Sequence, residues 1–474
     1  MIEKRQCEAL VVGGGPGGYA AAIRLGKLGV NTILVEGDKV GGTCLIRGCI
    51  PSKALIEASH FYHGVIQSSH SSGNEMGISI GKSYLNFSQT IAWKDGIVKQ
   101  LNQGVKHLVK AAKVDIIQGW ATFKNAKTCE VKSESGVIEI ESESVVLATG
   151  STPIEIPSIP FGENIIDSES ALDLKEVPKK LLILGAGYIG VELGFVYQKM
   201  GAEVTFIEGA ESILPGFDKS LRDPVHTHLK ELGADIIVNA KATAANQTKA
   251  SVSLNYIDNQ GKEKTLKANK LLVTVGRKPN TQGWGIENMA IDMNGAFIKV
   301  NNQCKTVMKG VYAIGDLTGE PMLAHKATAQ GELVAEVIAG HHRVFEPSCI
   351  PAICYTDPEI FSIGMNPEEA KQAYGDILVG QFPLAANGRT LTMNGLANSK
   401  TSFVRIVARQ DNQLIIGIQA VGDHISELSG ESVALIEMAA TLEDVAGMIH
   451  GHPTISEAIL EACLLALGRP IHVT

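Results

Sequence analysis

Apolar runs followed by glycine-rich turns and helical patterns recur along the chain. The first instance is EALVVGGGPGGYAAAIRLGKLGVNTILVEG, residues 8–37, where an apolar run leads into a glycine turn, a small-residue helix and a second apolar run. The second is KKLLILGAGYIGVELGFVYQKMGAEVTFIEG, residues 179–209. Short continuous apolar runs bounded by turns are typical of strands buried in a parallel sheet. The pattern therefore predicts two β-α-β units.

Three further apolar runs also end in glycine turns. They are VVLATGSTP (residues 145–153), which reaches Gly150, LLVTVGRKPN (271–280), which reaches Gly276, and GVYAIGDLTGEPMLAHKA (310–327), which leads to Asp316. Each has the length expected of a buried strand. The carboxylate of Asp316 could contact the polar part of a cofactor or cap the following helix, and the pattern leaves both interpretations open.

Length and composition describe a large folded protein. A chain of 474 residues, with 45% hydrophobic and 19% charged residues, predicts about three domains of α/β type and argues against disorder. The formal net charge of −8 gives no basic surface for nucleic acid. The N-terminus lacks the pattern of a signal or transit peptide, and no apolar run reaches the roughly 18 residues that cross a bilayer. We therefore expect a cytoplasmic protein without a membrane span.

Each β-α-β unit carries a G-x-G-x-x-G turn, with an acid 18 residues after the last glycine. The first set is Gly13, Gly15, Gly18 and Glu36, and the second is Gly185, Gly187, Gly190 and Glu208. The first glycine of such a motif makes the tight turn, the second lets the backbone approach a pyrophosphate, and the third lets helix and strand pack closely. Two copies at one spacing predict two dinucleotide sites, whereas plain β-α-β turns with surface glutamates are the alternative. The acid binds ribose hydroxyls and repels a 2′-phosphate, so Glu208 favours NAD over NADP.

Two cysteines stand five positions apart in GGTCLIRGCIPSK, residues 41–53. In a regular helix Cys44 and Cys49 would be about 7.5 Å apart along the axis, beyond the roughly 7 Å Cα separation that a disulfide tolerates. At least one of them must therefore lie in a distorted turn or a loop, for which Gly48 gives freedom. A helix N-terminus and Lys53 would both lower a thiol pKa. This pattern favours a redox pair over a structural disulfide, and no second Cys or His pair nearby supports a metal site.

The remaining cysteines are scattered, and we expect them to be inert in a reducing compartment. They are Cys7, Cys129, Cys304, Cys349, Cys354 and Cys463.

The segment HGHPTISEAILEACLLALG, residues 450–468, places His452 before a proline and Glu457 at a predicted helix start. The two side chains could form an imidazole with its orienting carboxylate, poised as a general base for a thiol. A histidine at a turn that is merely solvated is the alternative.

Together these motifs resemble those of the flavin disulfide reductases that carry an N-terminal redox cysteine pair. Within that group the sequence is similar to the dihydrolipoamide dehydrogenase family, the E3 components of 2-oxo acid dehydrogenase complexes. The matching segments follow the family's order from residue 10 to beyond 460: GGGPGG, GGTC, GCIPSK, ATGS, GAGYIG, VGRKPN, AIGD, PMLAHKA, YTDPE and HPT.

The resemblance implies FAD at the first glycine turn and NAD at the second. Glu36 would bind the adenosine ribose of FAD, Asp316 would lie on its ribityl side, and Lys53 would lie near the flavin and pair with Glu192. Glu208 would bind NAD. The resemblance adds further cofactor contacts at Gly42, Thr43, Ala121, Thr149, Gly150, Ala324, Gly276 and Arg277.

The resemblance also implies catalytic roles. Cys49 would be the thiol next to the flavin and Cys44 the thiol that exchanges with dihydrolipoamide. His452, supported by Glu457, would be the general base for the cysteine pair of the other subunit. The implied enzyme is a homodimer that oxidises the lipoyl domain of an E2 protein or a glycine cleavage H protein. It would dock on the E2 core or on its subunit-binding domain.

The implied fold is α/β, with two Rossmann-like domains and a C-terminal α+β dimerisation domain. We expect an FAD-binding domain at 1–150, an NAD-binding domain at 151–276, a central domain completing the FAD site at 277–348, and the dimerisation domain at 349–474. For the last domain we expect a mixed sheet with helices on one face.

The chain departs from the family pattern between the cysteines, where Ile46 and Arg47 replace the usual asparagine and small apolar residue. We hypothesise that Arg47 stabilises a thiolate. Thr328 and Gln330 stand where acidic residues are common. Neither departure removes a catalytic atom.

Related families fit less well. Glutathione reductases would place arginines soon after Glu208, whereas the next arginine here is Arg222. Mercuric and large thioredoxin reductases add a C-terminal redox pair, which the tail GRPIHVT lacks. A catalytically idle scaffold that docks on an assembly is the alternative from another class. Pyruvate, 2-oxoglutarate, branched-chain and glycine-cleavage complexes all remain open, although FPLAANGRTLTMNG (382–395) and GIQAVGDHISELS (417–429) resemble branched-chain forms.

Overall fold

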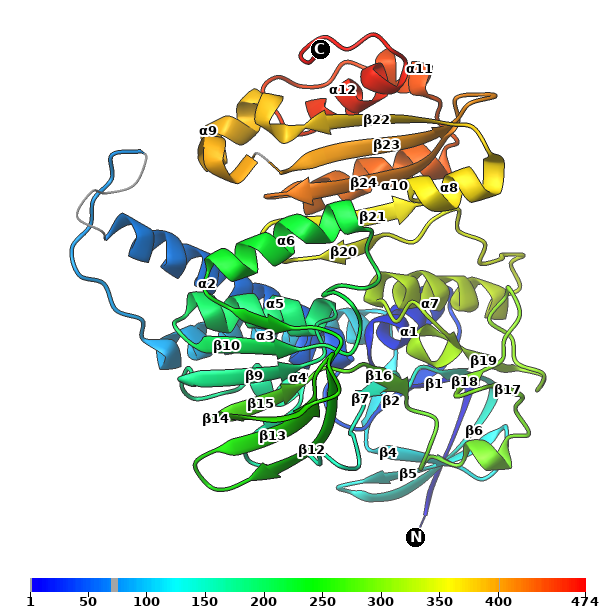
Figure 1. Cartoon of the computed structure of the whole chain (residues 1–474). Helices are drawn as coiled ribbons and strands as arrows, with labels where there is room; N and C mark the ends of the chain where they lie inside the picture. The colour runs from blue at the N-terminus through cyan, green and yellow to red at the C-terminus, as the bar shows by residue number, and fades with distance from the viewer. Residues whose placement is uncertain (1, 70–75, 400) are drawn as a thin grey trace.

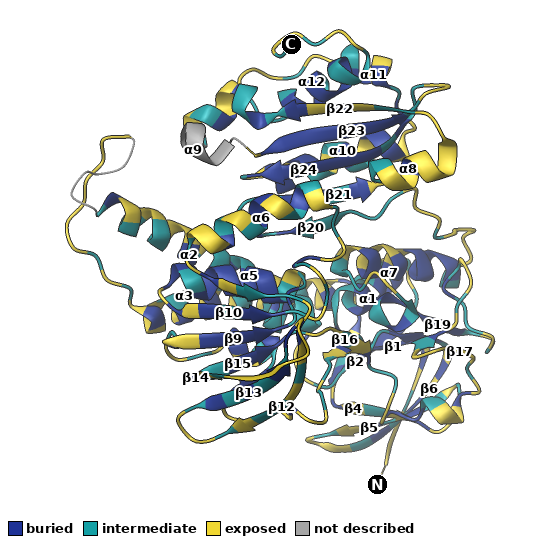
Figure 2. Cartoon of the chain, viewed as in Figure 1, coloured by how far each residue is buried: buried dark blue, intermediate teal, exposed yellow. Residues whose placement is uncertain are grey.

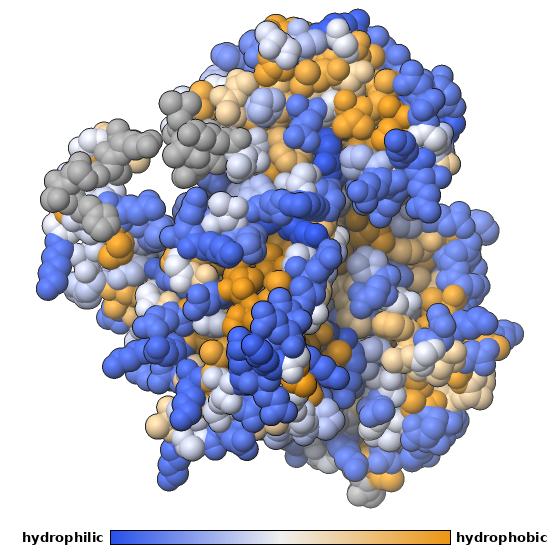
Figure 3. Space-filling model, in the orientation of Figure 1, coloured by the Kyte–Doolittle hydropathy of each residue, from blue (hydrophilic) through white to orange (hydrophobic). Residues whose placement is uncertain are grey.

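Three sheets organise the chain in the computed structural model, which describes residues 2–69, 76–399 and 401–474 (Figure 1). The side chains of residues 394–399 lie outside the described part of the structure, and they include the last two residues of the segment 382–395. Buried residues follow the strands and the helices packed on them, as Figure 2 shows. Hydrophilic side chains cover most of the face drawn in Figure 3, which is hollowed between the parts built on the first two sheets.

The first sheet has a parallel core and an antiparallel edge, in the order β3-β2-β1-β6-β5-β4. Its strands are β1 (Glu3–Val12), β2 (Thr32–Glu36), β3 (Asp115–Gln118), β4 (Trp120–Phe123), β5 (Thr128–Ser133) and β6 (Gly136–Leu147). The much later strand β19 (Val311–Ala313) pairs with β6 in parallel. Residues 277–348 therefore return to the first sheet, and the domain boundaries assigned from the sequence stay a prediction.

Helices α1 (Pro16–Lys27) and α7 (Ala324–Ile338) pack together beside this sheet. The approach is close because Gly17 and Gly331 face each other: a Cβ on Gly331 would lie 2.3 Å from the Gly17 carbonyl oxygen. The packing brings the chain around residue 324 next to the first glycine turn. Two segments about 300 residues apart in the chain thus line one site.

The second sheet is parallel and has the order β11-β10-β9-β15-β8. Its strands are β8 (Ile165–Ile166), β9 (Lys180–Leu184), β10 (Glu203–Ile207), β11 (Asp235–Ile237) and β15 (Lys270–Val273), and its helices are α4 (Ser168–Ala171), α5 (Tyr188–Lys199) and α6 (Lys219–Glu231). A separate antiparallel sheet comprises β12 (Lys241–Gln247), β13 (Val252–Ile257) and β14 (Glu263–Ala268). The two β-α-β units predicted from the apolar pattern are present, one in each parallel sheet.

A short antiparallel ladder connects the two units. It consists of β7 (Ser151–Pro153), where the chain leaves the first sheet, and β16 (Arg277–Pro279), where it returns. A helical pair, α2 (Cys49–Ser68) and α3 (Phe87–Ala111), makes a second connection, because α2 packs against α5 of the second unit. None of the helices in the described residues is long and apolar enough to cross a membrane.

The third sheet is antiparallel throughout, in the order β20-β21-β24-β23-β22. The expectation of a mixed sheet was wrong, because hairpins and returning connections join its strands. The strands are β20 (Ala352–Cys354), β21 (Glu359–Gly364), β22 (Ile377–Pro383), β23 (Phe403–Arg409) and β24 (Ile415–Gly422). The accompanying helices are α8 (Pro367–Tyr374), α9 (Gly388–Ser399), α10 (Ser429–Glu437), α11 (Leu442–Ala446) and α12 (Glu457–Ala466).

Alternation along these strands separates two packing faces. Val404 and Ile406 face a core shared with helices α10 to α12. Arg405, between them, points the other way and forms hydrogen bonds with Asp218 and Ser220 at the start of α6. The third sheet is thereby fixed to the second unit.

The remaining short strands are β17 (Met293–Asn294) and β18 (Phe297–Ile298).

Candidate active site

The first glycine turn forms a cradle around its middle glycine. Gly13 has a positive φ of 102°, and a Cβ there would lie 2.2 Å from the Ala148 carbonyl oxygen. A Cβ on Gly18 would lie 1.8 Å from the Gly13 carbonyl oxygen, so neither position accepts a larger residue. The nearest atom to a Cβ on Gly15 is 3.9 Å away. The outer glycines therefore serve packing, and the middle one leaves backbone accessible to a phosphate.

The second glycine turn repeats this geometry. A Cβ on Gly185 would lie 2.6 Å from the Thr274 carbonyl oxygen, and one on Gly190 would lie 2.1 Å from the Gly185 carbonyl oxygen. No atom of the described residues lies within 4 Å of a Cβ on Gly187. Both turns thus have the space that a pyrophosphate needs beside a helix N-terminus.

The acid after each unit is held by backbone N–H groups. Glu36 accepts hydrogen bonds from the N–H of Gly14 (2.6 Å) and of Asp38 (2.7 Å). Glu208 accepts equivalent bonds from Ala186 (2.6 Å) and Ala210 (2.8 Å). These bonds orient each carboxylate at the end of its strand, where it can accept further bonds from ribose hydroxyls.

A cavity of about 440 Å³ lies between the two units and brings most of the predicted site residues together. Its lining includes Gly13, Gly15, Gly18, Glu36, Gly42, Thr43, Cys44, Cys49, Lys53, Ala121, Thr149, Gly150, Glu192, Arg277, Asp316 and Ala324. Gly185, Gly187, Gly190, Glu208 and Gly276 belong to the second turn and its neighbourhood and lie outside this lining, as do His452 and Glu457.

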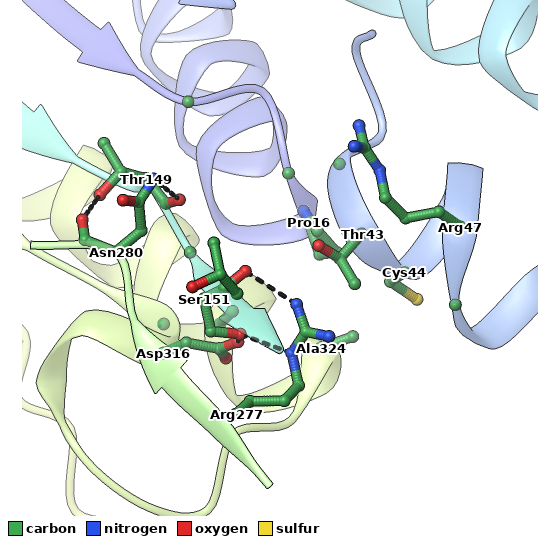
Figure 4. A pocket seen from close by; sticks show the side chains of 18 of the residues that line it. Pro16, Thr43, Cys44, Arg47, Thr149, Ser151, Arg277, Asn280, Asp316 and Ala324 are labelled. Atoms are coloured by element: carbon green, nitrogen blue, oxygen red, sulfur yellow. Dashed lines mark hydrogen bonds between the residues drawn. The ribbon is translucent and has the colours of Figure 1, made fainter. Parts of the chain in front are cut away.

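Asp316 lies on the wall of the cavity in a short 3₁₀ turn, Gly315–Thr318. Ser151 donates a hydrogen bond to its carboxylate at 2.5 Å, and Arg277 Nε donates to the Ser151 hydroxyl at 2.8 Å (Figure 4). The residue at the N-cap position of α7 is Leu323. The helix-cap interpretation of Asp316 was therefore wrong, and the position favours cofactor contact.

The two cysteines lie on either side of a break in the helix. Cys44 belongs to a single π-helical turn, Thr43–Arg47, and Cys49 is the first residue of α2. Gly48 lies between them, and a Cβ there would lie 2.9 Å from the Thr43 carbonyl oxygen. The distorted turn expected from the five-residue spacing is therefore present, and the two cysteines are not joined by a disulfide.

The thiols form a hydrogen-bonded pair with unequal acidities. The hydrogen bond with Cys44 lowers the pKa of Cys49 to about 7; burial opposes the effect and the Lys53 ammonium adds to it. The same hydrogen bond and burial raise the pKa of Cys44. Cys49 is thus the thiolate of the reduced pair.

Lys53 and Glu192 join α2 to α5 through an ion pair of 2.8 Å. Burial alone would lower the pKa of Lys53, but the Glu192 carboxylate outweighs burial and raises it. Lys53 Nζ also lies 4.4 Å from the centre of the Tyr355 ring, and the Tyr355 N–H donates to Glu192 at 2.9 Å. The ammonium is therefore held as a fixed positive charge beside the thiols.

Arg47 does not serve as the thiolate partner. Its guanidinium points away from the Cys44 sulfur (Figure 4) and forms ion pairs with Asp38 and Glu169. The cation that lowers the pKa of Cys49 is Lys53. The hypothesis that Arg47 stabilises the thiolate is corrected accordingly.

His452 and Glu457 form the expected pair, with Nδ1 and Oε1 2.9 Å apart. The Thr454 N–H donates to the other carboxylate oxygen at 2.9 Å. Burial would raise the pKa of Glu457, but the bonds from Thr454 and His452 lower it. The His452 side chain is 80% exposed and outside the cavity of its own chain, so a single chain does not bring it to the thiols.

The other cysteines have the properties of inert thiols. Burial raises the pKa of Cys7 and Cys349 to about 11 and that of Cys129, Cys304 and Cys463 to about 12. Cys354 is fully buried, and its pKa is also raised. Within the described ranges there is no group of His, Cys, Asp and Glu side chains that could hold a metal ion.

Comparison with known families agrees with this geometry. Residues 8–331 match the pyridine nucleotide-disulphide oxidoreductase family, and residues 350–463 match the dimerisation domain of the same family. The chain belongs to this family. The dimerisation domain makes the protein a homodimer.

Relatives in the family match the chain over its whole length. A dihydrolipoyl dehydrogenase of Pseudomonas aeruginosa is 47% identical over 475 residues, covering 100% of both chains. One of Geobacillus stearothermophilus is 43% identical, covering 99% of this chain and 98% of that protein. The solved structure of LpdA from Mycobacterium tuberculosis matches with a TM-score of 0.86 at 25% identity, covering 96% of this chain and 99% of that chain.

The cofactors of this family member are FAD and NAD. The residues present fit them, because both glycine turns leave their middle glycine accessible and both acids are already oriented. The lining of the large cavity runs from Glu36 past the first turn to Lys53 and the thiols. The first turn would hold FAD, with its redox-active part towards Lys53, and the second would hold NAD.

Sequence reasoning missed several residues of this family member's site. Ser151 and Glu169 line the cavity between the two units, and Trp120 lines it beside Glu36. Tyr355, which holds Lys53 and Glu192, lies in the YTDPE motif and could have been found from that motif. Nothing in the local sequence distinguishes Ser151 or Glu169, because their role depends on the packing of the two units.

Proposed function

We propose that this chain oxidises dihydrolipoyl groups to lipoyl groups and reduces NAD, the reaction for which its relatives are named. The observation that carries the proposal is the thiol pair of Cys44 and Cys49, with unequal acidities, on the wall of a dinucleotide cavity. The 47% identity to a dihydrolipoyl dehydrogenase over the full length supports it. An idle scaffold would need neither the lowered thiol pKa nor the fixed charge of Lys53.

The chemistry begins with a disulfide between Cys44 and Cys49. A substrate thiolate attacks the Cys44 sulfur, the bond between the cysteines breaks, and Cys49 leaves as a thiolate. Its low pKa makes it the better leaving group. The second substrate thiol then attacks the mixed disulfide, so that the lipoyl disulfide forms and Cys44 is released and protonated. Bound FAD would supply the two-electron chemistry that links oxidation of the Cys44–Cys49 dithiol back to its disulfide with reduction of NAD to NADH.

His452 supplies the proton acceptor in this proposal. Glu457 accepts a hydrogen bond from the Nδ1–H group and orients the ring, so Nε2 is the nitrogen that removes a proton from a substrate thiol. The ring lies outside the cavity of its own chain. We therefore assign it to the cysteine pair of the second subunit, which makes each site complete only in the dimer.

The acids determine the cofactors. Glu36, fixed by the Gly14 and Asp38 N–H groups, would bind the adenosine ribose of FAD. Glu208, fixed by the Ala186 and Ala210 N–H groups, would bind the ribose of NAD and repel the 2′-phosphate of NADP.

The physiological substrate we propose is a lipoyl domain of an E2 protein or a glycine cleavage H protein, with docking on an E2 core or its subunit-binding domain. A branched-chain 2-oxo acid complex is the first to test, because of the segments 382–395 and 417–429. We also propose a cytoplasmic location, since a reducing compartment suits a catalytic thiol pair among free cysteines.

Steady-state assays discriminate this function from its rivals. The rate of NAD reduction by dihydrolipoamide is measured beside NADP reduction and beside reduction of glutathione disulfide by NADPH. A fast rate only in the first assay supports the proposal. A fast rate only with NADPH and glutathione disulfide would overturn it, and no rate in any assay of the FAD-loaded dimer would favour the scaffold.

A further inference from the structure

Arg47 joins the two dinucleotide-binding units at the wall of the large cavity. One terminal nitrogen pairs with the Asp38 carboxylate, which follows β2 in the first unit. The other lies 3.6 Å from Glu169 Oε2 on α4 of the second unit. All three residues line the cavity. A single side chain, placed between the redox cysteines, therefore contacts acids on both sides.

The contact continues across the cavity wall as a line of alternating charges. Glu169 Oε1 lies 4.0 Å from Arg277, which donates to Ser151, and Ser151 donates to Asp316. The line thus runs from Asp38, beside the adenosine-binding acid, to Asp316 on the proposed ribityl side. Figure 4 shows Arg47 on one side of this cavity and Arg277, Ser151 and Asp316 on the other.

The ion pairs are partly shielded from solvent. The exposed fraction is 31% for the Arg47 side chain, 26% for Glu169 and 10% for Arg277. Burial raises the pKa of Glu169, while the two arginines act in the opposite direction. Loss of Arg47 would leave Glu169 with a single, more distant cation. The pair with Glu169 is partly buried and is therefore worth more than a fully exposed pair, whereas the Asp38 side chain is 45% exposed and its pair is worth less.

Residues of both units line the cavity. One wall is the first unit with Gly15 and Glu36, and the other includes Tyr188 and Glu192 of α5. A dinucleotide lying between them would be enclosed by both units. An ion pair that spans the units therefore opposes release.

We propose that Arg47 is a latch that retains FAD by tying Asp38 of the first unit to Glu169 of the second. The proposal requires FAD in the cavity but does not depend on the identity of the thiol substrate. It also separates two possible roles of Arg47, because a latch changes FAD retention and leaves the acidity of Cys49 unchanged.

The test is the rate of FAD release from the oxidised holoenzyme, followed by the increase in flavin fluorescence. Wild type is compared with Arg47→Met, which keeps the length of the side chain, with Glu169→Gln, and with the double variant. Arg5→Met is the matched control, because Arg5 pairs with the exposed carboxylates of Glu3 and Asp115 near the start of β1 in the first sheet. Release is measured at low salt and in roughly 1 M KBr, where exposed charges are screened.

The latch predicts FAD release roughly three- to tenfold faster in Arg47→Met, the range for losing one exposed pair with Asp38 and one partly buried pair with Glu169. Glu169→Gln should show part of this increase, and the effects of the two single variants should not multiply in the double variant, because both remove the contact between Arg47 and Glu169. Arg5→Met should match wild type, and KBr should narrow the difference between wild type and Arg47→Met.

Equal release rates for Arg47→Met and wild type would overturn the proposal, as would multiplicative effects in the double variant. If Arg47→Met does not fold, Glu169→Gln and Arg47→Lys carry the test. Arg47→Lys should release FAD at an intermediate rate, because one ammonium cannot pair with both acids as a guanidinium does. Alkylation of Cys49 should keep its pH dependence in Arg47→Met, and a shift would favour a thiolate role instead. The release assay needs only bound FAD. Its result therefore tests the latch even if the protein does not oxidise dihydrolipoamide.

Discussion

Lys53 and Glu192 form the contact that couples the redox helix to the second unit, with Nζ and Oε2 2.8 Å apart. Glu192 is 4% exposed, and its other oxygen accepts the Tyr355 N–H. The pair fixes the positive charge of Lys53 beside the thiols and buries the negative charge of Glu192. The first effect can be tested through the pKa of Cys49, and the second through the stability of the fold.

Removal of Lys53 should destabilise the protein more than removal of the whole pair. Lys53→Met leaves a buried carboxylate without its cation, which costs roughly 3 to 5 kcal/mol of unfolding free energy. The double variant Lys53→Met with Glu192→Gln removes that charge and should recover part of the loss. Thermal unfolding of the FAD-loaded proteins measures the loss in Lys53→Met and its recovery in the double variant. A double variant less stable than Lys53→Met would contradict the assignment.

Thiol reactivity should report the acidity of Cys49. In the reduced enzyme the pKa of Cys49 is lowered to about 7, so alkylation at this residue should rise through that pH. Lys53→Met should move the rise upward by roughly one unit or more. Because the folded-state pKa is below the ordinary thiol value, ionisation of Cys49 stabilises the reduced fold at alkaline pH, and this contribution is lost as pH falls through about 7. Mass spectrometry of alkylated peptides distinguishes Cys49 from the six inert cysteines, whose reactivity should remain low.

Glu208 should determine the choice between NAD and NADP. Glu208→Gln removes the charge that repels a 2′-phosphate and keeps the size of the side chain. We expect KM for NAD to rise by roughly tenfold, the value of about 1.4 kcal/mol for one charged hydrogen bond, and the relative rate with NADP to increase. Glu36→Gln is the matched control at the first turn, where FAD retention and not nicotinamide selectivity should change. Unchanged selectivity in Glu208→Gln would show that residues other than Glu208 distinguish NAD from NADP at the second site.

Mixed dimers test whether the base acts across subunits. Homodimers of Cys44→Ser and of His452→Ala should both lack activity. In a mixed dimer the cysteine pair of the His452→Ala subunit meets the intact histidine of the Cys44→Ser subunit, so one of the two sites is complete. Random exchange of subunits should then restore about one quarter of wild-type activity, because half the dimers are mixed and each has one complete site. No recovered activity after verified subunit exchange would place His452 and the cysteines of one chain in the same site.

The periodic and local features of the site were predictable from the sequence, and its contacts between units were not. The two glycine turns and their acids follow from spacing, because each motif and its acid lie within one β-α-β unit, although the close approach of Gly13 to Ala148 and of Gly185 to Thr274 comes from the end of a neighbouring strand. The distorted turn between Cys44 and Cys49 followed from helix geometry. The antiparallel third sheet was mispredicted, because strand direction depends on connections and not on apolar pattern.

Arg47 shows the limit of local reasoning most clearly. Its position between two cysteines suggested a partner for a thiolate, yet its side chain reaches acids 9 residues before it and 122 residues after it. The ion pair with Glu169 depends on where α4 of the second unit lies relative to residue 47, which the sequence around residue 47 does not encode. Ser151 was missed for the same reason, since its partners Arg277 and Asp316 come from distant segments.

The most direct test of the central claim is the rate of NAD reduction by a reduced lipoyl domain, measured for wild type and Cys44→Ser side by side. The account predicts a fast rate in wild type and a loss of at least about a thousandfold in Cys44→Ser, although FAD should remain bound in both. A Cys44→Ser enzyme that reduces NAD at a rate close to wild type would show that electrons do not pass through the cysteine pair.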